Sequence, residues 1–214
     1  MATSPVLRRF HSAWALLHRD GLSSLLQEVW RKVATFETYL AFRIDLRHEI
    51  PLLPDALSLL VRRADEKDFA HFRSMPYPFL RHAQFYDRFG IDECYLAFSQ
   101  GEIAHIAWVY YPDQLKKHPT PFRILRADEA AIANCVTIPQ FRGKGVYPAV
   151  VRTLLEDLKK RGYRHCYMYI EVDNVASQRG VSKLGFRPAG KSLRLRLFCH
   201  SDPAAGFYFR GRCP

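Results

Sequence analysis

Residues 131–162 read AIANCVTIPQFRGKGVYPAVVRTLLEDLKKRG, and this stretch decides the fold. Just before and within it, residues 130–138 are apolar enough for an interior strand, and residues 146–161 space their apolar side chains as one face of a helix does. Between them lies a short loop, 140–145, that holds two glycines. The stretch therefore predicts a strand, a tight loop and a helix in immediate succession.

The loop has the features of an anion-binding site. Gly143 and Gly145 allow the backbone to turn tightly and to approach a ligand without Cβ clashes. The unpaired amides at the helix start point outward together, and the helix dipole adds positive charge there. Arg142 and Lys144 strengthen that charge, and Pro148 in the first helical turn costs little. We expect the loop to hold phosphate, although neither a nucleotide P-loop nor a Rossmann fingerprint is present.

The flanking sequence predicts alternating strands and helices. A strand is expected at residues 57–62, a helix from Asp65, a second helix at 79–89, and a hairpin of 93–98 and 102–111 that turns at Gln100-Gly101. After the central stretch we expect a strand at 165–172, a helix at 174–184 that ends at Gly185, and closing strands at 191–199 and 206–210.

The first 54 residues are expected to form a helical extension. Apolar side chains from Leu22 to Leu40 follow helical spacing, and Pro51 and Pro54 end the pattern. The division is therefore 1–54 for the extension and 55–214 for the main domain. The extension could pack against the core, mediate a homodimer, or use its basic residues for peripheral membrane contact through residues 1–40.

Composition excludes several classes of protein. Apolar residues make up 48% of the 214 residues and charged residues 25%, which excludes wholesale disorder. No run approaches the roughly 18 apolar residues of a membrane-spanning helix, and the apolar run behind the first arginines is too short for a signal peptide, so we expect a cytoplasmic protein. The five cysteines form no C-x-x-C pair and the histidines no H-x-x-x-H pair, so no metal is expected.

The positive charge is concentrated at one end of the chain. The net charge is +11, and residues 141–214 contribute +10 of it, with 15 basic and 5 acidic residues. A localised positive field attracts polyanions such as a phosphorylated cofactor. Because no nucleic-acid reader motif is present, we expect no nucleic-acid partner.

Two motifs resemble those of a known family. QFRGKG at 140–145 resembles the acyl-CoA-binding motif of the GNAT superfamily of N-acyltransferases, and NVASQRGVSKLGF at 174–186 is similar to its second motif. The order of elements over roughly residues 55–200 is also similar. The resemblance implies an α+β fold with a GNAT-like bent mixed β-sheet flanked by helices. A weaker similarity links residues 1–54 to GNAT proteins associated with bacterial surface-polysaccharide clusters.

The resemblance also implies a cofactor site. In the family, acetyl-CoA or another acyl-CoA is the co-substrate, the loop amides hold its pyrophosphate, and its pantetheine arm lies along the preceding strand. The residues implied to bind it here are Val136, Thr137, Ile138, Arg142, Gly143, Lys144, Gly145, Val146, Tyr147, Asn174 and Ser177.

Acid and base residues are less well defined. An amine with a pKa of about 10 must lose a proton before it attacks a thioester, and the candidate acceptors are Glu129, Glu171 and His105, with Glu129 preferred. The family often has a tyrosine as acid toward the thiolate at the position of Val181. Here the thiolate would leave unassisted, or one of three other tyrosines would replace that acid: Tyr147, Tyr167 or Tyr169.

Three functions remain open at this level. The first is an acyl-CoA-dependent N-acyltransferase, most simply an N-acetyltransferase, in which the amine attacks directly. The second uses an acyl carrier protein or a long-chain donor. The third is a non-catalytic acyl-CoA-binding module. The acceptor would be a small amine, including an amino sugar, or a peptide, in a pocket expected to involve aromatic side chains at Tyr77, Phe79, Tyr86 and Trp108.

Overall fold

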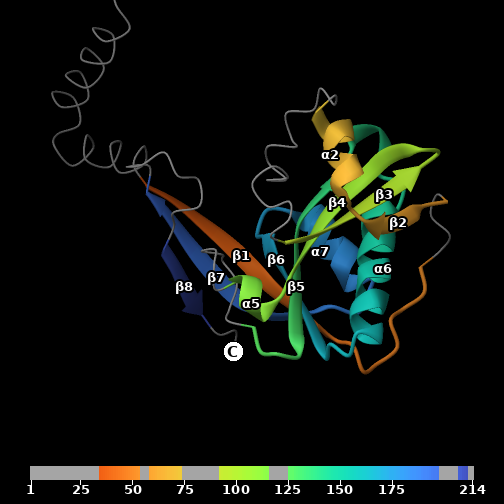
Figure 1. Ribbon diagram of the computed structural model, residues 1–214. Helices are drawn as coiled ribbons and strands as arrows, with labels where there is room; N and C mark the ends of the chain where they lie inside the picture. The colour runs from red at the N-terminus through yellow and green to blue at the C-terminus, as the bar shows by residue number, and fades with distance from the viewer. Residues whose placement is uncertain (1–33, 54–57, 74–91, 116–124, 198–206, 212–214) are drawn as a thin grey trace, which may run out of the picture.

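The strand, loop and helix predicted for the central stretch are all present in the computed structural model, which describes residues 34–53, 58–73, 92–115, 125–197 and 207–211 (Figure 1). The strands are β1 (Ala34–Asp45), β2 (Leu60–Arg63), β3 (Glu93–Ser99), β4 (Glu102–Tyr110), β5 (Glu129–Thr137), β6 (His165–Glu171), β7 (Arg187–Leu197) and β8 (Phe207–Gly211). The helices are α2 (Glu66–Arg73), α5 (Pro112–Leu115), the short 3₁₀ helix η1 (Pro139–Phe141), α6 (Val146–Lys160) and α7 (Val175–Ser182).

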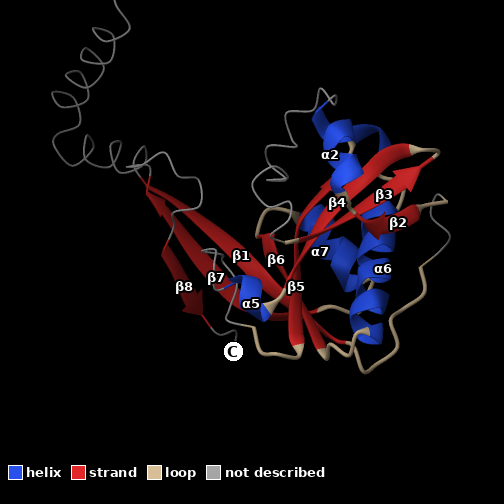
Figure 2. Cartoon of the chain, viewed as in Figure 1, coloured by secondary structure: helices blue, strands red, loops and turns tan. Residues whose placement is uncertain are grey.

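The described strands form one mixed sheet with the order β2-β3-β4-β5-β6-β1-β7-β8 (Figure 2). Strands β5 and β6 are parallel, with α6 as the crossover between them, and the other paired strands are antiparallel. The predicted α+β fold, a mixed sheet flanked by helices, is therefore confirmed. None of the described helices is both long enough and apolar enough to cross a bilayer.

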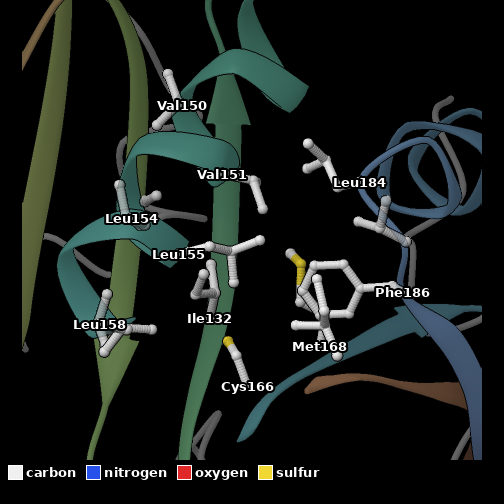
Figure 3. Close-up of a cluster of buried hydrophobic side chains, with 14 of the residues drawn as sticks. Ile132, Val150, Val151, Leu154, Leu155, Leu158, Cys166, Met168, Leu184 and Phe186 are labelled. Carbon is white, nitrogen blue, oxygen red and sulfur yellow. The ribbon is translucent and has the colours of Figure 1, made fainter. Parts of the chain in front are cut away.

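Helix α6 covers one face of the sheet with the apolar side predicted from its spacing. Its buried residues recur every three or four positions, and they pack against β5, β6 and the segment that ends α7 (Figure 3). Burial of such a stripe is the main favourable term for a surface helix. The residues of this contact include Val150, Leu154, Leu155, Leu158, Ile132, Met168 and Phe186.

The other face carries a second apolar cluster. Phe72 of α2 packs there with Leu96 of β3, Trp108 and Tyr110 of β4, and Tyr167 of β6. Trp108, which the sequence suggested as a wall of the acceptor pocket, is fully buried in this cluster. The other three aromatic residues of that expectation, and the helix expected at 79–89, lie outside the described residues.

The local turns follow the predicted chemistry. Gln100 (φ 51°) and Gly101 (φ 82°) both have positive φ, as a two-residue hairpin turn between β3 and β4 requires. At the start of α2, the Asp68 side chain accepts the amide of Asp65 at 2.8 Å and a bidentate contact from Arg62 at 2.7 Å. The predicted hairpin and the predicted helix start at Asp65 are confirmed.

The helical prediction for the N-terminal segment is wrong for residues 34–45. This segment is β1, which lies between β6 and β7, so the sheet includes residues well before the boundary placed near residue 54. Its sequence alternates on the sheet, with Phe42 and Ile44 buried and Arg43 exposed between them. Aromatic and β-branched residues suit both an amphipathic helix and a strand, and pairing with two neighbours decides between them. Residues 1–33 lie outside the described residues.

The position of β1 predicts a large contribution of Phe42 to stability. Phe42 is 4% exposed and packs in the α6 cluster, so Phe42→Ala should lower the free energy of unfolding by about 3–5 kcal/mol. Arg43→Ala, on the opposite face of the same strand, should change it by less than about 1 kcal/mol. Urea denaturation followed by circular dichroism measures both. Equal and small effects would show that β1 does not belong to the folded sheet.

Candidate functional site

Strands β5 and β6 separate after a short paired region. The pairing runs from Glu129 opposite His165 to Ile132 opposite Met168, whereas β5 continues to Thr137 and β6 to Glu171. On its other side, β5 is irregular, because the register with β4 shifts and Asn134 has a φ of 49°. A bulge bends a strand and redirects its edge. The second half of β5 therefore presents its edge to an opening in the sheet.

A cavity of about 700 Å³ lies along this opening. Its wall on the β5 side is Cys135, Val136 and Thr137, and the glycine loop, the first turn of α6 and residues between 174 and 183 along α7 complete it. Nine of the eleven residues implied to bind the cofactor line the cavity: Val136, Thr137, Arg142, Gly143, Gly145, Val146, Tyr147, Asn174 and Ser177. The other two, Ile138 and Lys144, are not among its lining residues; Ile138 is fully buried.

The glycine loop has the predicted backbone. Gly143 and Gly145 both have a φ of 74°, a conformation that side chains disfavour, and Gly145 is the N-cap of α6. The Arg142 Nε donates to the Thr137 carbonyl at 3.1 Å, which fixes the loop to the end of β5. The first backbone bond into α6 runs from the Ala149 amide to the Gly145 carbonyl at 3.2 Å. The amides before Ala149 are therefore directed to the cavity end of the helix.

The charge along the cavity is positive. Arg142 comes from the loop, Arg179 from α7 and Lys183 from the C-cap of α7, and among the described lining residues none is acidic. Arg179 and Lys183 were not among the residues predicted from the sequence. Their spacing of four residues, which places two cations on one side of a helix, was the available signal.

Asn174 and Ser177 connect the two helices of the site. The Asn174 Oδ1 accepts the Ser177 amide at 3.1 Å, which caps α7. The Ser177 Oγ donates to the Tyr147 hydroxyl at 2.7 Å. The Tyr147 ring lies against Gly180, where a Cβ would come within 3.0 Å of the ring atoms Cδ1 and Cε1. Gly180 therefore gives Tyr147 the room to lie between α6 and α7.

His105 lies at the edge of the site but in a dry environment. It is fully buried on β4, its Nδ1 shares a hydrogen bond of 2.7 Å with the Thr137 hydroxyl, and its ring centre is 5.9 Å from that of Tyr147. Its Nε2 has no partner among the described residues. Burial lowers the pKa of His105 to about 3, so the ring is neutral at physiological pH.

The two candidate carboxylates lie at opposite ends of the paired strands. Glu129 is 3% exposed at the start of β5, where its carboxylate accepts the Arg126 amide at 2.9 Å and the Tyr167 hydroxyl at 3.2 Å. Glu171 is exposed at the end of β6. The structure therefore does not bring the three candidate proton acceptors together at one point.

A second cavity of similar size, about 690 Å³, lies where β1 ends and β7 begins. Side chains of both signs line it, including Arg43, Glu49 and Arg187. It contains none of the residues predicted for the cofactor. Within the described ranges, no three histidine, cysteine, aspartate or glutamate side chains are grouped so that they could hold a metal ion.

Solved structures similar to this chain share its fold. A Drosophila protein aligns with a TM-score of 0.52 and 16% identity over 83% of this chain and 58% of its own. A GCN5-related N-acetyltransferase from Sphaerobacter thermophilus aligns with a TM-score of 0.53 and 14% identity, over 84% of this chain and 57% of its own. An acetyltransferase of the GNAT family from Colwellia psychrerythraea also aligns with a TM-score of 0.53 and 14% identity, over 84% of this chain and 62% of its own. The chain thus spans about three fifths of the length of these proteins.

Sequence comparison gives the family. No curated protein matches the chain. The model of the "Acetyltransferase (GNAT) family", in contrast, matches residues 60–186. That range includes both quoted motifs, β5, α6, α7 and every lining residue of the 700 Å³ cavity. Since the match covers more than half of the chain, the resemblance is confirmed, and the protein belongs to the GNAT family of acetyltransferases.

Proposed function

We propose that the protein transfers an acyl group, most simply acetyl, from acyl-CoA to an amine. The observation that carries this proposal is the opening between β5 and β6 beside the glycine loop. The free edge of β5 can bind an extended ligand, and the start of α6 can bind a phosphate group at one end of that ligand. Membership of the acetyltransferase family supports the same chemistry.

The cavity suggests how acyl-CoA would lie. The amides from Gly143 to Tyr147 would hold the diphosphate, with Arg142, Arg179 and Lys183 adding charge. The pantetheine arm would extend along Cys135–Thr137, which places the thioester near the irregular region of β5. Ile138 and Lys144 would then contribute only through their backbone.

The reaction would be a direct attack. The amine nitrogen attacks the thioester carbonyl, and the resulting oxyanion would be stabilised by backbone N–H groups on the free edge of β5. The acceptor would be a small amine, an amino sugar or a peptide. A carrier-protein donor, a homodimer and membrane contact through residues 1–40 stay predictions from the sequence.

Among the three candidates for the proton acceptor, we keep Glu129 as the preferred one. His105 is neutral and fully buried, and a pKa of about 3 makes it a weak base. Glu129 is linked through the Tyr167 hydroxyl to the face of the sheet opposite α6. In this proposal, the amine would pass its proton through the Tyr167 hydroxyl to Glu129.

The proposal predicts a specific effect of Gly143→Ala on cofactor binding. Alanine at φ 74° is strained by about 1–2 kcal/mol, and relief of that strain would turn the loop amides away from the diphosphate. Calorimetric titration should show that affinity for acetyl-CoA falls about tenfold. Gly101→Ala is the matched control, because it has a φ of 82°, equally open surroundings and a place in a distant hairpin. An equal loss in both variants, or no binding by the wild type, would contradict the proposal.

The neutral state of His105 predicts a pH-dependent stability. Its pKa lies below the ordinary 6.5 in the folded protein, so the unfolded chain binds a proton first as the pH falls, and stability is lost below about pH 6.5. Between about pH 6.5 and pH 4.5, the wild type should lose about 2 kcal/mol more free energy of unfolding than His105→Gln. Denaturant titrations across that range measure the difference. Identical slopes would mean that His105 titrates normally.

The choice of proton acceptor predicts different kinetics for two variants. Once an amine substrate is found by screening, Glu129→Gln should lower kcat at neutral pH by about 10²-fold or more and leave the KM for acetyl-CoA within about threefold. Glu171→Gln, which keeps an exposed polar side chain, should retain kcat. The opposite pattern would assign the proton to Glu171.

A further inference from the structure

We propose that the Tyr147 hydroxyl, supported by Ser177, gives its proton to the coenzyme A sulfur as the thioester breaks. The inference rests on the proposed function, because it assigns a residue to the leaving group of that reaction. It starts from a chemical need: breaking the C–S bond leaves an electron pair on sulfur, and a hydrogen-bond donor stabilises the thiolate that forms.

The position where the family often has this donor cannot supply it here. Val181 is an apolar side chain, fully buried in the cluster under α6. A donor must therefore reach the cavity from another element.

Tyr147 reaches the cavity from the start of α6. Its ring occupies the space that Gly180 leaves free on α7, and both residues line the cavity with Cys135. Cys135 borders the irregular part of β5, where the thioester would lie. In the proposed pose, the Tyr147 hydroxyl would meet the thioester at this part of the cavity.

The hydrogen bond with Ser177 leaves the Tyr147 proton available. In the proposed arrangement, the Ser177 Oγ, 2.7 Å from the Tyr147 oxygen, donates this hydrogen bond and leaves the Tyr147 hydrogen for the sulfur. Burial raises the pKa of Tyr147 far above its usual range, which keeps the hydroxyl protonated, and the bond from Ser177 lowers the pKa in part. Ser177 would also stabilise the phenolate after transfer.

The other two tyrosines suggested by the sequence are placed differently. The Tyr167 hydroxyl donates to Glu129 on the opposite face of the sheet, in the cluster that contains Phe72 and Trp108. Tyr169 packs against the same cluster. Neither residue lines the cavity. The structure therefore selects Tyr147 from the three.

The step balances as a general-acid cleavage. The tetrahedral intermediate collapses, the C–S bond breaks, and its electron pair moves to sulfur. Sulfur takes the proton of the Tyr147 hydroxyl to give the free thiol of coenzyme A. The Tyr147 phenolate regains a proton from solvent, and the amine-derived proton leaves separately through the base.

Coenzyme A and desulfo-coenzyme A, which lacks the sulfur, test the contact without any knowledge of the acceptor. At about pH 9, where the thiol ionises, calorimetry on the full chain should show that Tyr147→Phe weakens coenzyme A binding about tenfold and leaves desulfo-coenzyme A unchanged. Ser177→Ala should give a smaller loss for coenzyme A only. Tyr163→Phe, at the other end of α6 with its ring stacked on Tyr111, is the matched control and should affect neither ligand.

The outcomes separate this inference from the proposed function. If Tyr147→Phe weakens both ligands equally, Tyr147 only shapes the cavity, and the inference is overturned while acyl-CoA binding stands. If it weakens neither, the hydroxyl does not meet the sulfur and the inference is again overturned. If the wild type binds neither ligand, the proposed function itself fails, and the inference fails with it.

Discussion

The separation of β5 from β6 is the constraint on which the site depends. Two parallel strands that share only four paired positions leave backbone groups on β5 that need partners. The irregular register with β4 and the left-handed Asn134 redirect the strand, and α6 holds both strands from one face. The sheet thus keeps a rigid opening without losing its core, and an extended ligand can supply the missing edge.

The glycine loop and the basic residues line the same cavity as this opening, so together they form one candidate binding site. An anion-binding turn occurs in many proteins and does not by itself identify an acyl-CoA site. Here the turn lies beside a cavity whose wall includes the free edge of β5. The excess positive charge of the last third of the chain is partly explained by Arg142, Arg179 and Lys183 along that cavity. His105 supports the same wall from behind, through its bond to Thr137.

Much of the fold could be predicted because local patterns and tertiary contacts agree. A helix is the one structure that fits the spacing of Val150, Leu154 and Leu158, and a hairpin is the one that fits the turn at Gly101. The segment 34–45 did not, since its aromatic and β-branched residues fit either a helix face or a strand, and only its two partner strands resolve the choice. Likewise, a sequence cannot show that Gly180 makes room for Tyr147, or that Trp108 lies in a core, because these follow from distant packing.

Hydrogen–deuterium exchange of the full chain, with and without acetyl-CoA, shows whether the ligand occupies the opening between β5 and β6. If the ligand lies between β5 and β6, amide protection should rise in the peptides that contain residues 134–147 and 174–183, and nowhere as strongly elsewhere. Unchanged exchange in those peptides, or protection centred on the cavity beside Arg43 and Arg187, would contradict binding between β5 and β6.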